Sequence, residues 1–192
     1  MLFLRVLDQI LTHNQRFVKD KKYEPFQTEK FPKKKLVIVS CMDTRLLELL
    51  PKAMNIRNGD AKMIKTAGAL IDHPFGGVMK SILVAVYELG AKEICVVGHH
   101  ECGMASLESD EIIDKMKARG ITERDFALLQ NAGIDLKQFL RGFECVETSV
   151  EQSVKMIQNH PLVPNDVIVH GLVIDPRTGK LDVVVNGYND ST

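Results

Sequence analysis

Three side chains with metal-binding chemistry follow two short apolar stretches of the sequence. Cys41 comes directly after the run 36–40, and His99 and then Cys102 follow the run 94–98. A lone cysteine at such a position is usually a small buried hydrophobe, and a lone H-x-x-C pattern often occurs by chance. Two thiolates and one imidazole together suit zinc, and three protein ligands leave the fourth tetrahedral position for water. The combination predicts a zinc site.

An acidic and a basic residue follow the first of these cysteines, in the sequence Cys41-Met-Asp43-Thr-Arg45. A closed structural zinc site needs neither charge. Asp43 can accept a hydrogen bond from a water on the metal, and Arg45 can hold that carboxylate by a bidentate pair, so that it does not itself take the fourth position. Without the zinc ligands, an aspartate at a helix start near an ordinary arginine would be the simpler interpretation. With them, Asp43 and Arg45 are the predicted catalytic residues.

The elements that must position these residues alternate between strands and helices. The runs 36–40 and 94–98 are short, apolar and rich in β-branched residues, as in strands of a parallel sheet that is covered on both faces. The other predicted elements are a strand at 62–66, a helix at about 77–90, a helix at 146–159 and a hairpin of strands 167–174 and 181–185. This order predicts an α/β fold with a mainly parallel central sheet, flanking helices and an antiparallel C-terminal strand. Ligands bind beyond the carboxyl ends of parallel strands, where the predicted zinc ligands lie.

A helix precedes these strands. Apolar residues recur at helical spacing from Phe3 to Val18, which predicts an amphipathic helix over about residues 2–20. The segment 23–32 carries two prolines and mixed charge, which is typical of a surface connector. The apolar stripe of the helix must pack against another surface.

Length and charge narrow the class of protein. At 192 residues, a single domain spanning 1–192 is the simplest expectation. Lysine plus arginine and aspartate plus glutamate each number 25, so no net charge draws the chain to nucleic acid or to an anionic membrane. The start lacks a signal-peptide cleavage pattern, and no stretch approaches the roughly 18 apolar residues of a membrane helix. We therefore expect a cytoplasmic protein with neither nucleic acid nor a membrane as partner.

Several patterns of the chain together resemble one known family. They occur in the order Ser40-Cys-Met-Asp-Thr-Arg45, Ala67-Gly68, Ser81-Ile-Leu-Val-Ala-Val-Tyr-Glu-Leu-Gly90, Gly98-His-His-Glu-Cys-Gly103 and Thr178-Gly-Lys-Leu181. In these patterns the chain resembles the β-class carbonic anhydrases over residues 36–181. The C-x-D-x-R pattern followed much later by H-x-x-C is specific, whereas the short Ala-Gly and Thr-Gly pieces are weak by themselves.

The resemblance implies a zinc ion bound by Cys41, His99 and Cys102. It implies that Asp43 and Arg45 form a catalytic dyad, and that the small-molecule substrate is carbon dioxide, hydrated reversibly to bicarbonate and a proton. It further implies a homodimer or a higher homo-oligomer in which the N-terminal helix packs across the subunit boundary. Some family members have a closed form in which the aspartate of C-x-D-x-R is the fourth zinc ligand, a position that Asp43 would take here.

Other interpretations of the same residues stay open. Thr66 stands where the family commonly has asparagine, just before Ala-Gly. Hydrolysis of carbonyl sulfide or carbon disulfide would use the same metal chemistry with different access to the site. A non-catalytic zinc or thiol sensor would need the ligands but not the Asp43–Arg45 pair. His73 and His100 are near the motifs in sequence only, so neither is assigned as a proton shuttle.

Overall fold

The structure of the chain is a computed structural model that describes residues 5–189. The chain divides into two compact units, one up to Lys30 and one from Phe31 onward. The second unit contains the sheet and all five predicted site residues. No helix within residues 5–189 has the length and apolar character needed to cross a membrane. A single domain over 1–192 stays a prediction.

The first unit carries an amphipathic helix near the N-terminus. Helix α1 runs from Val6 to Lys19, and a short 3-10 helix, η1, follows at Glu24–Phe26. The predicted start of this helix at residue 2 lies outside the described residues. No residue of α1 is buried, and five apolar side chains of its stripe are more than half exposed: Val6, Leu7, Ile10, Leu11 and Val18.

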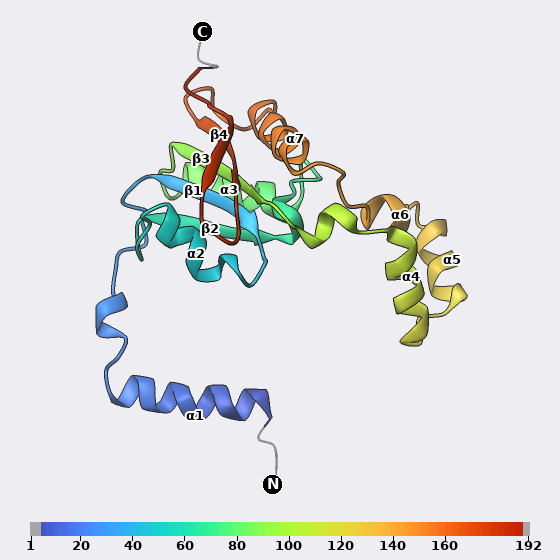
Figure 1. Ribbon diagram of the computed structural model, residues 1–192, viewed down its shortest axis with the longest axis horizontal. Helices are drawn as coiled ribbons and strands as arrows, with labels where there is room; N and C mark the ends of the chain where they lie inside the picture. Colours follow the sequence, from blue (N-terminus) through green and yellow to red (C-terminus); the bar gives the residue numbers. More distant parts are fainter. Residues whose placement is uncertain (1–4, 190–192) are drawn as a thin grey trace. The chain divides into compact units, whose positions relative to one another are not determined.

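The second unit is built on a five-stranded sheet with the order β2-β1-β3-β4-β5 (Figure 1). Its strands are β1 Leu36–Cys41, β2 Ala61–Thr66, β3 Glu93–His99, β4 Ile168–Ile174 and β5 Leu181–Val185. The pairs β1–β2, β1–β3 and β3–β4 are parallel, and β5 pairs antiparallel with β4. The predicted mainly parallel sheet with an antiparallel C-terminal strand is confirmed.

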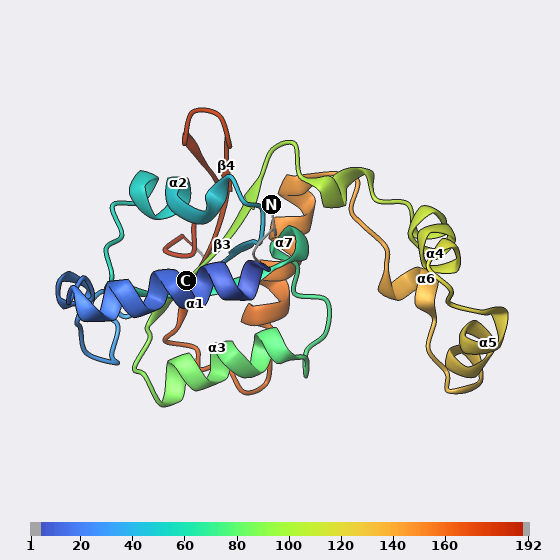
Figure 2. The same cartoon turned by 90° about the horizontal axis from the view of Figure 1, so that it is seen from below.

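Successive residues of β1 point into two separate cores. Val37 packs with buried residues of α3 (Gly77–Tyr87) and α7 (Val146–Gln158). Ile38 packs on the other side with buried residues of α2 (Leu46–Ala53). Figure 2 shows α2 and α3 on opposite sides of the strands. Because both faces are covered, the central strands are apolar along nearly their whole length.

Three short helices lie between β3 and α7 in the sequence and to one side of the sheet in space (Figure 1). They are α4 Ser109–Ala118, α5 Glu123–Asn131 and α6 Leu136–Phe139. None of their residues is buried. They therefore add little to the core that positions the site.

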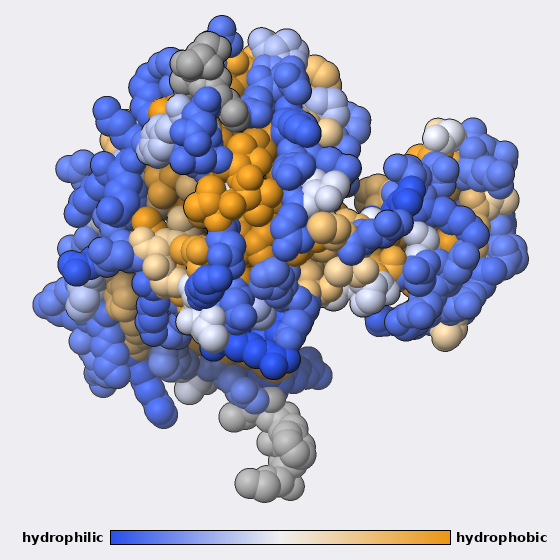
Figure 3. Space-filling view, turned by 45° about the horizontal axis from the view of Figure 1, so that its top comes forward, coloured by the Kyte–Doolittle hydropathy of each residue, from blue (hydrophilic) through white to orange (hydrophobic). Residues whose placement is uncertain are grey.

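Apolar side chains also remain on the surface of the second unit. Leu47, Phe75, Tyr87 and Val183 are each more than 60% exposed. The space-filling view shows a group of apolar residues near the middle of one face (Figure 3). Contiguous apolar surface of this kind often marks a contact surface for another protein.

Candidate metal centre

The ends of two neighbouring strands bring two predicted ligands together. Cys41 is the last residue of β1, and His99 is the last residue of β3. These strands pair in parallel with Ser40 opposite Val97, so both side chains emerge at the same edge of the sheet. Cys41 is 5% exposed and His99 is 1% exposed. Both donors are therefore withdrawn from bulk solvent.

A tight reversal after β3 brings the third predicted ligand to the same place. Glu101 has a φ of +56°, in the left-handed region, and Cys102 directly precedes the 3-10 helix η3 at Gly103–Ser106. Cys102 is 6% exposed. The reversal lets His99 and Cys102, which belong to different elements, face one centre.

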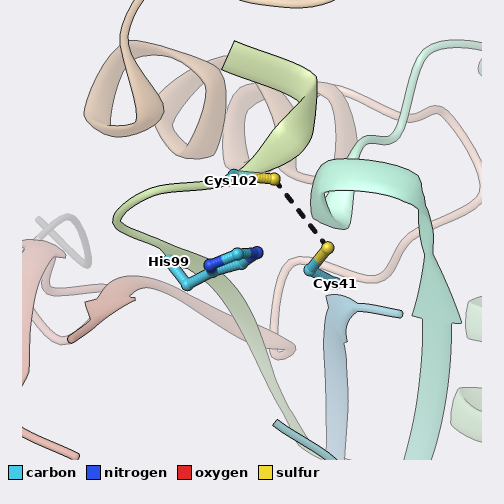
Figure 4. A group of neighbouring side chains, drawn as sticks. All are labelled: Cys41, His99 and Cys102. Carbon is cyan, nitrogen blue, oxygen red and sulfur yellow. Dashed lines mark hydrogen bonds between the residues drawn. The ribbon is translucent and has the colours of Figure 1, made fainter. Parts of the chain in front are cut away.

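The three ligand atoms form one compact cluster. The Sγ atoms of Cys41 and Cys102 and a ring nitrogen of His99 all lie within 4.8 Å of one another. The two Sγ atoms are 3.9 Å apart. Figure 4 shows the three side chains converging from the end of β1, the end of β3 and the turn that follows it. No other three His, Cys, Asp or Glu side chains converge in this way within the described part of the chain.

The imidazole of His99 is oriented toward a metal. Its Nδ1 lies 2.8 Å from the carbonyl oxygen of His100, which fixes the tautomer in which Nδ1 donates and Nε2 carries the lone pair. Nε2 is buried and has no hydrogen-bond partner within residues 5–189. An unpartnered buried polar atom costs roughly 1–3 kcal/mol. A metal ion beside the two sulfur atoms would satisfy it, so the donors present fit zinc.

The two cysteine side chains form a hydrogen-bonded pair, with their Sγ atoms 3.9 Å apart. A hydrogen bond from Cys102 lowers the pKa of Cys41 far below that of an ordinary thiol, against the opposing effect of burial. The adjacent imidazole of His99 and backbone hydrogen bonds from Asp43 and Gly68 lower the Cys41 pKa further. The same contact and burial raise the pKa of Cys102. Since the thiolate is the form that binds metal, Cys41 is prepared to bind it.

The predicted acidic and basic residues form a bidentate ion pair. Arg45 donates from Nε to Asp43 Oδ1 at 3.0 Å and from Nη2 to Oδ2 at 2.8 Å, and its backbone N–H donates to Oδ1 at 2.8 Å. These bonds hold the pKa of Asp43 at about 2. Asp43 Oδ2 lies 3.7 Å from Nε2 of His99. An ionised carboxylate therefore borders the cluster.

The end of β2 also borders the cluster. Lys65 Nζ donates to the carbonyl oxygen of Cys41 at 3.3 Å, and burial lowers the pKa of this lysine. Thr66, which stands in place of the family's usual asparagine, donates from Oγ1 to the carbonyl oxygen of Leu70 at 3.3 Å. The Thr66 hydroxyl thus closes the turn around the 3-10 helix η2 at Ala67–Ala69.

Two residues outside the predicted set extend the ion pair, because Glu101 contacts Arg45 and Arg177 contacts Glu101. Glu101 accepts from Arg45 through Oε2 at 3.3 Å and through its carbonyl oxygen at 3.1 Å. Arg177 pairs with the other carboxylate oxygen of Glu101. Glu101 lies inside the H-x-x-C motif, but its left-handed backbone has no sequence signal. Arg177 is 76 residues away along the chain, so spacing could not connect the two.

Comparisons with known proteins agree with this geometry. The family model described as carbonic anhydrase matches residues 36–181. The Bacillus subtilis protein named "Putative carbonic anhydrase YvdA" is 64% identical over 182 residues, covering 95% of this chain and 92% of that protein. A carbon disulfide hydrolase of Acidithiobacillus thiooxidans is 29% identical over 157 residues, covering 77% of this chain and 76% of that protein. The crystal structure of β-carbonic anhydrase isoform I from Trichomonas vaginalis matches with a TM-score of 0.88 and 33% identity, covering 96% of this chain and 100% of that one.

Proposed function

Because the chain belongs to the β-carbonic anhydrase family, we propose that it is a zinc enzyme that reversibly hydrates carbon dioxide to bicarbonate and a proton. The observation that carries the proposal is the buried Nε2 atom of His99. This atom lacks a hydrogen-bond partner among the described residues and lies in one cluster with the sulfur atoms of Cys41 and Cys102. A donor set of two sulfurs and one nitrogen supports zinc as the ion.

Cys41, His99 and Cys102 are the proposed zinc ligands. When bound, zinc supplies a Lewis acid that lowers the pKa of water enough to give a nucleophile near neutral pH. The chain contributes donors that are already oriented, because the carbonyl of His100 fixes the His99 tautomer. Burial of all three donors keeps competing solvent away from them.

Asp43 and Arg45 are the proposed catalytic residues. Arg45 keeps Asp43 ionised and fixes both of its oxygens. Oδ2, the oxygen nearer to His99, can accept a hydrogen bond from the attacking water and so turn a water lone pair toward carbon dioxide. If the pair with Arg45 opened, the same carboxylate could become a fourth ligand, as in the closed form that the family resemblance implies.

Hydrolysis of carbon disulfide is the second candidate. A relative with this name is 29% identical to the chain over 157 residues. Carbon disulfide is a linear sulfur analogue of carbon dioxide, so the same nucleophile and the same carboxylate could act on it. The two activities would differ in which molecule reaches the site.

A homodimer or a larger homo-oligomer is the proposed assembly. The apolar stripe of α1 is exposed in the described chain, and so is part of the apolar surface of the second unit. Apolar surface of this extent is usually covered by another protein. The cytoplasmic location expected from the sequence stays a prediction.

Elemental analysis and stopped-flow assays on the purified protein test the proposal. We expect about one zinc ion per chain and hydration of carbon dioxide that exceeds the buffer rate. Cys41→Ser should lose both zinc and activity, whereas Cys145→Ser, a matched change at an exposed thiol, should keep both. Zinc without carbon dioxide hydration at any pH, together with sulfide release from carbon disulfide, would favour the second candidate. Zinc with neither activity would contradict both.

A further inference from the structure

The backbone of Glu101 has a left-handed conformation that is energetically unfavourable for a glutamate. Its φ of +56° lies in the left-handed region, where glycine or asparagine is favoured because they avoid or offset the clash of Cβ with the backbone. Its side chain is 47% exposed, so burial does not explain a long acidic side chain here. Residues held in such conformations cluster at functional sites. A glutamate at this position is therefore expected to act through its side chain.

That side chain joins two arginines from different parts of the chain. Oε2 accepts from Arg45 Nη1 at 3.3 Å, and the carbonyl oxygen accepts from Arg45 Nη2 at 3.1 Å. Oε1 pairs with Arg177 Nη2. The Arg45 guanidinium is thus held by Asp43 on one side and by Glu101 on the other.

Arg177, the second arginine that contacts Glu101, lies in a tight turn. Asp175 Oδ1 accepts from the backbone N–H of Arg177 at 2.7 Å and from that of Thr178 at 2.9 Å. The turn follows β4, whose last residue, Ile174, accepts from the backbone N–H of His100 at 3.1 Å. Arg177 and Glu101 are therefore carried by segments that the sheet already holds side by side.

We propose that Glu101 is a positioning residue, which uses Arg177 as an anchor to hold Arg45 so that the Asp43 carboxylate stays turned away from the metal ligands. The inference rests on the proposed function of Asp43 and goes beyond it by assigning what restrains the dyad. Asp43 Oδ2 is only 3.7 Å from Nε2 of His99, so a small rotation of a released carboxylate would bring it among the ligands. The position that the attacking water needs would then be blocked.

The test uses variants that remove one charge at a time. Glu101→Gln weakens the ion pairs of Glu101 with Arg45 and with Arg177, and Arg177→Gln removes the second of these pairs. Lys180→Gln is the matched control, because Lys180 lies just beyond the same turn and its Nζ pairs with the exposed Asp182 rather than with Glu101. Glu101→Gly removes the side chain and also relieves the left-handed backbone, so backbone strain cannot explain a loss of function in it.

Two readouts are required. One is the pH profile of carbon dioxide hydration by the zinc proteins. The other, independent of activity, is the dissociation constant of azide for the cobalt(II)-substituted proteins, followed by visible absorption. Azide binds only if the fourth metal position is accessible. We expect Glu101→Gln, Glu101→Gly and Arg177→Gln to weaken azide binding and to slow hydration by about tenfold or more, and Lys180→Gln to match the wild-type protein.

A second substitution identifies the blocking group. Adding Asp43→Ala to Glu101→Gln should restore azide binding but not hydration, since the competing carboxylate is gone while the catalytic group is also lost. Azide affinity and hydration in Glu101→Gln equal to the wild-type values would overturn the inference, as would weakened azide binding that Asp43→Ala does not restore. A wild-type protein that hydrates no carbon dioxide but shows the expected azide pattern would reject the proposed function and leave the positioning role standing.

Discussion

The Sγ atoms of Cys41 and Cys102 lie 3.9 Å apart, close enough for one thiol to donate its proton to the other sulfur. In the metal-free protein this contact stabilises the Cys41 thiolate and opposes loss of the second proton from Cys102. Two thiols that interact this strongly titrate as a pair. Near neutral pH the pair therefore carries about one negative charge.

Thiolate absorbance in the ultraviolet tests this relationship. In a metal-free Cys145→Ser protein, which lacks the exposed thiol, we expect one deprotonation step well below pH 8. Cys95 should not contribute, because burial raises its pKa to about 11. Replacing Cys102 with alanine removes the donor, so the step should move toward the ordinary thiol value of about 8.5. An unchanged step in that variant would contradict a shared proton.

The ion pair of Asp43 should stabilise the fold in a pH-dependent way. Arg45 holds the pKa of Asp43 at about 2, below the value of about 3.9 in an unfolded chain. A depressed pKa gives stability that is full above the unfolded value and is lost as the pH falls through the folded value. Asp43→Asn should therefore lower the urea midpoint of the metal-free protein clearly at pH 6 and much less near pH 2. An equal loss at both values would show that charge is not the cause.

Carbon dioxide hydration should become faster as the pH rises from about 6 to 9. Cys41 and Cys102 would bring two negative charges to the metal, leaving it less electrophilic than three neutral imidazoles, which give an activated water with a pKa near 7. Asp43 cannot supply this titration, because its pKa is about 2. Stopped-flow rates at constant ionic strength measure the profile. Asp43→Asn should keep the rise at a rate about 10–100-fold lower, and a flat wild-type profile would refute the assignment.

The buried strands of the fold could be predicted because their environment leaves a strong pattern. β1 and β3 are covered on both faces and appear as unbroken apolar runs, so the observed bounds exceed the predicted ones by one residue at the end of β1 and by one residue at each end of β3. Helix α2 was not predicted as an element. It has eight residues and contains Pro51, so its periodic pattern is too short and too interrupted to indicate a helix.

The convergence of the three proposed ligands could be predicted from the sequence, but the contacts that hold Arg45 could not. Cys41 and His99 end neighbouring parallel strands, and topology alone makes such ends converge. Glu101 could not be assigned because its role depends on a left-handed turn and on the distant Arg177. The Glu101–Arg177 pair depends on the position of the β4–β5 turn relative to the site, and a local sequence pattern cannot predict that position.

Gly98 should be indispensable for the packing behind the site. A Cβ at Gly98 would lie 2.7 Å from Val146 Cγ2 and 2.8 Å from Val150 Cγ2, so Gly98→Ala must displace these two side chains of α7 or the helix that carries them. We expect a loss of roughly 1–3 kcal/mol in the free energy of unfolding. Zinc content should also fall, since His99 is the next residue. Gly103→Ala is the matched control, because nothing lies within 4 Å of a Cβ there, and its urea midpoint should stay at the wild-type value.

The apolar stripe of α1 should be a subunit contact. Ile10 is 57% exposed in the described chain and lies on the stripe, whereas Thr12 lies on the opposite side of the helix. Burying a charge in an apolar interface is unfavourable, so Ile10→Asp should weaken self-association by about tenfold or more, and Thr12→Asp should leave it unchanged. Light scattering coupled to size-exclusion chromatography over a dilution series measures both. If the two variants dissociate at the same concentration as the wild-type protein, another surface holds the subunits together.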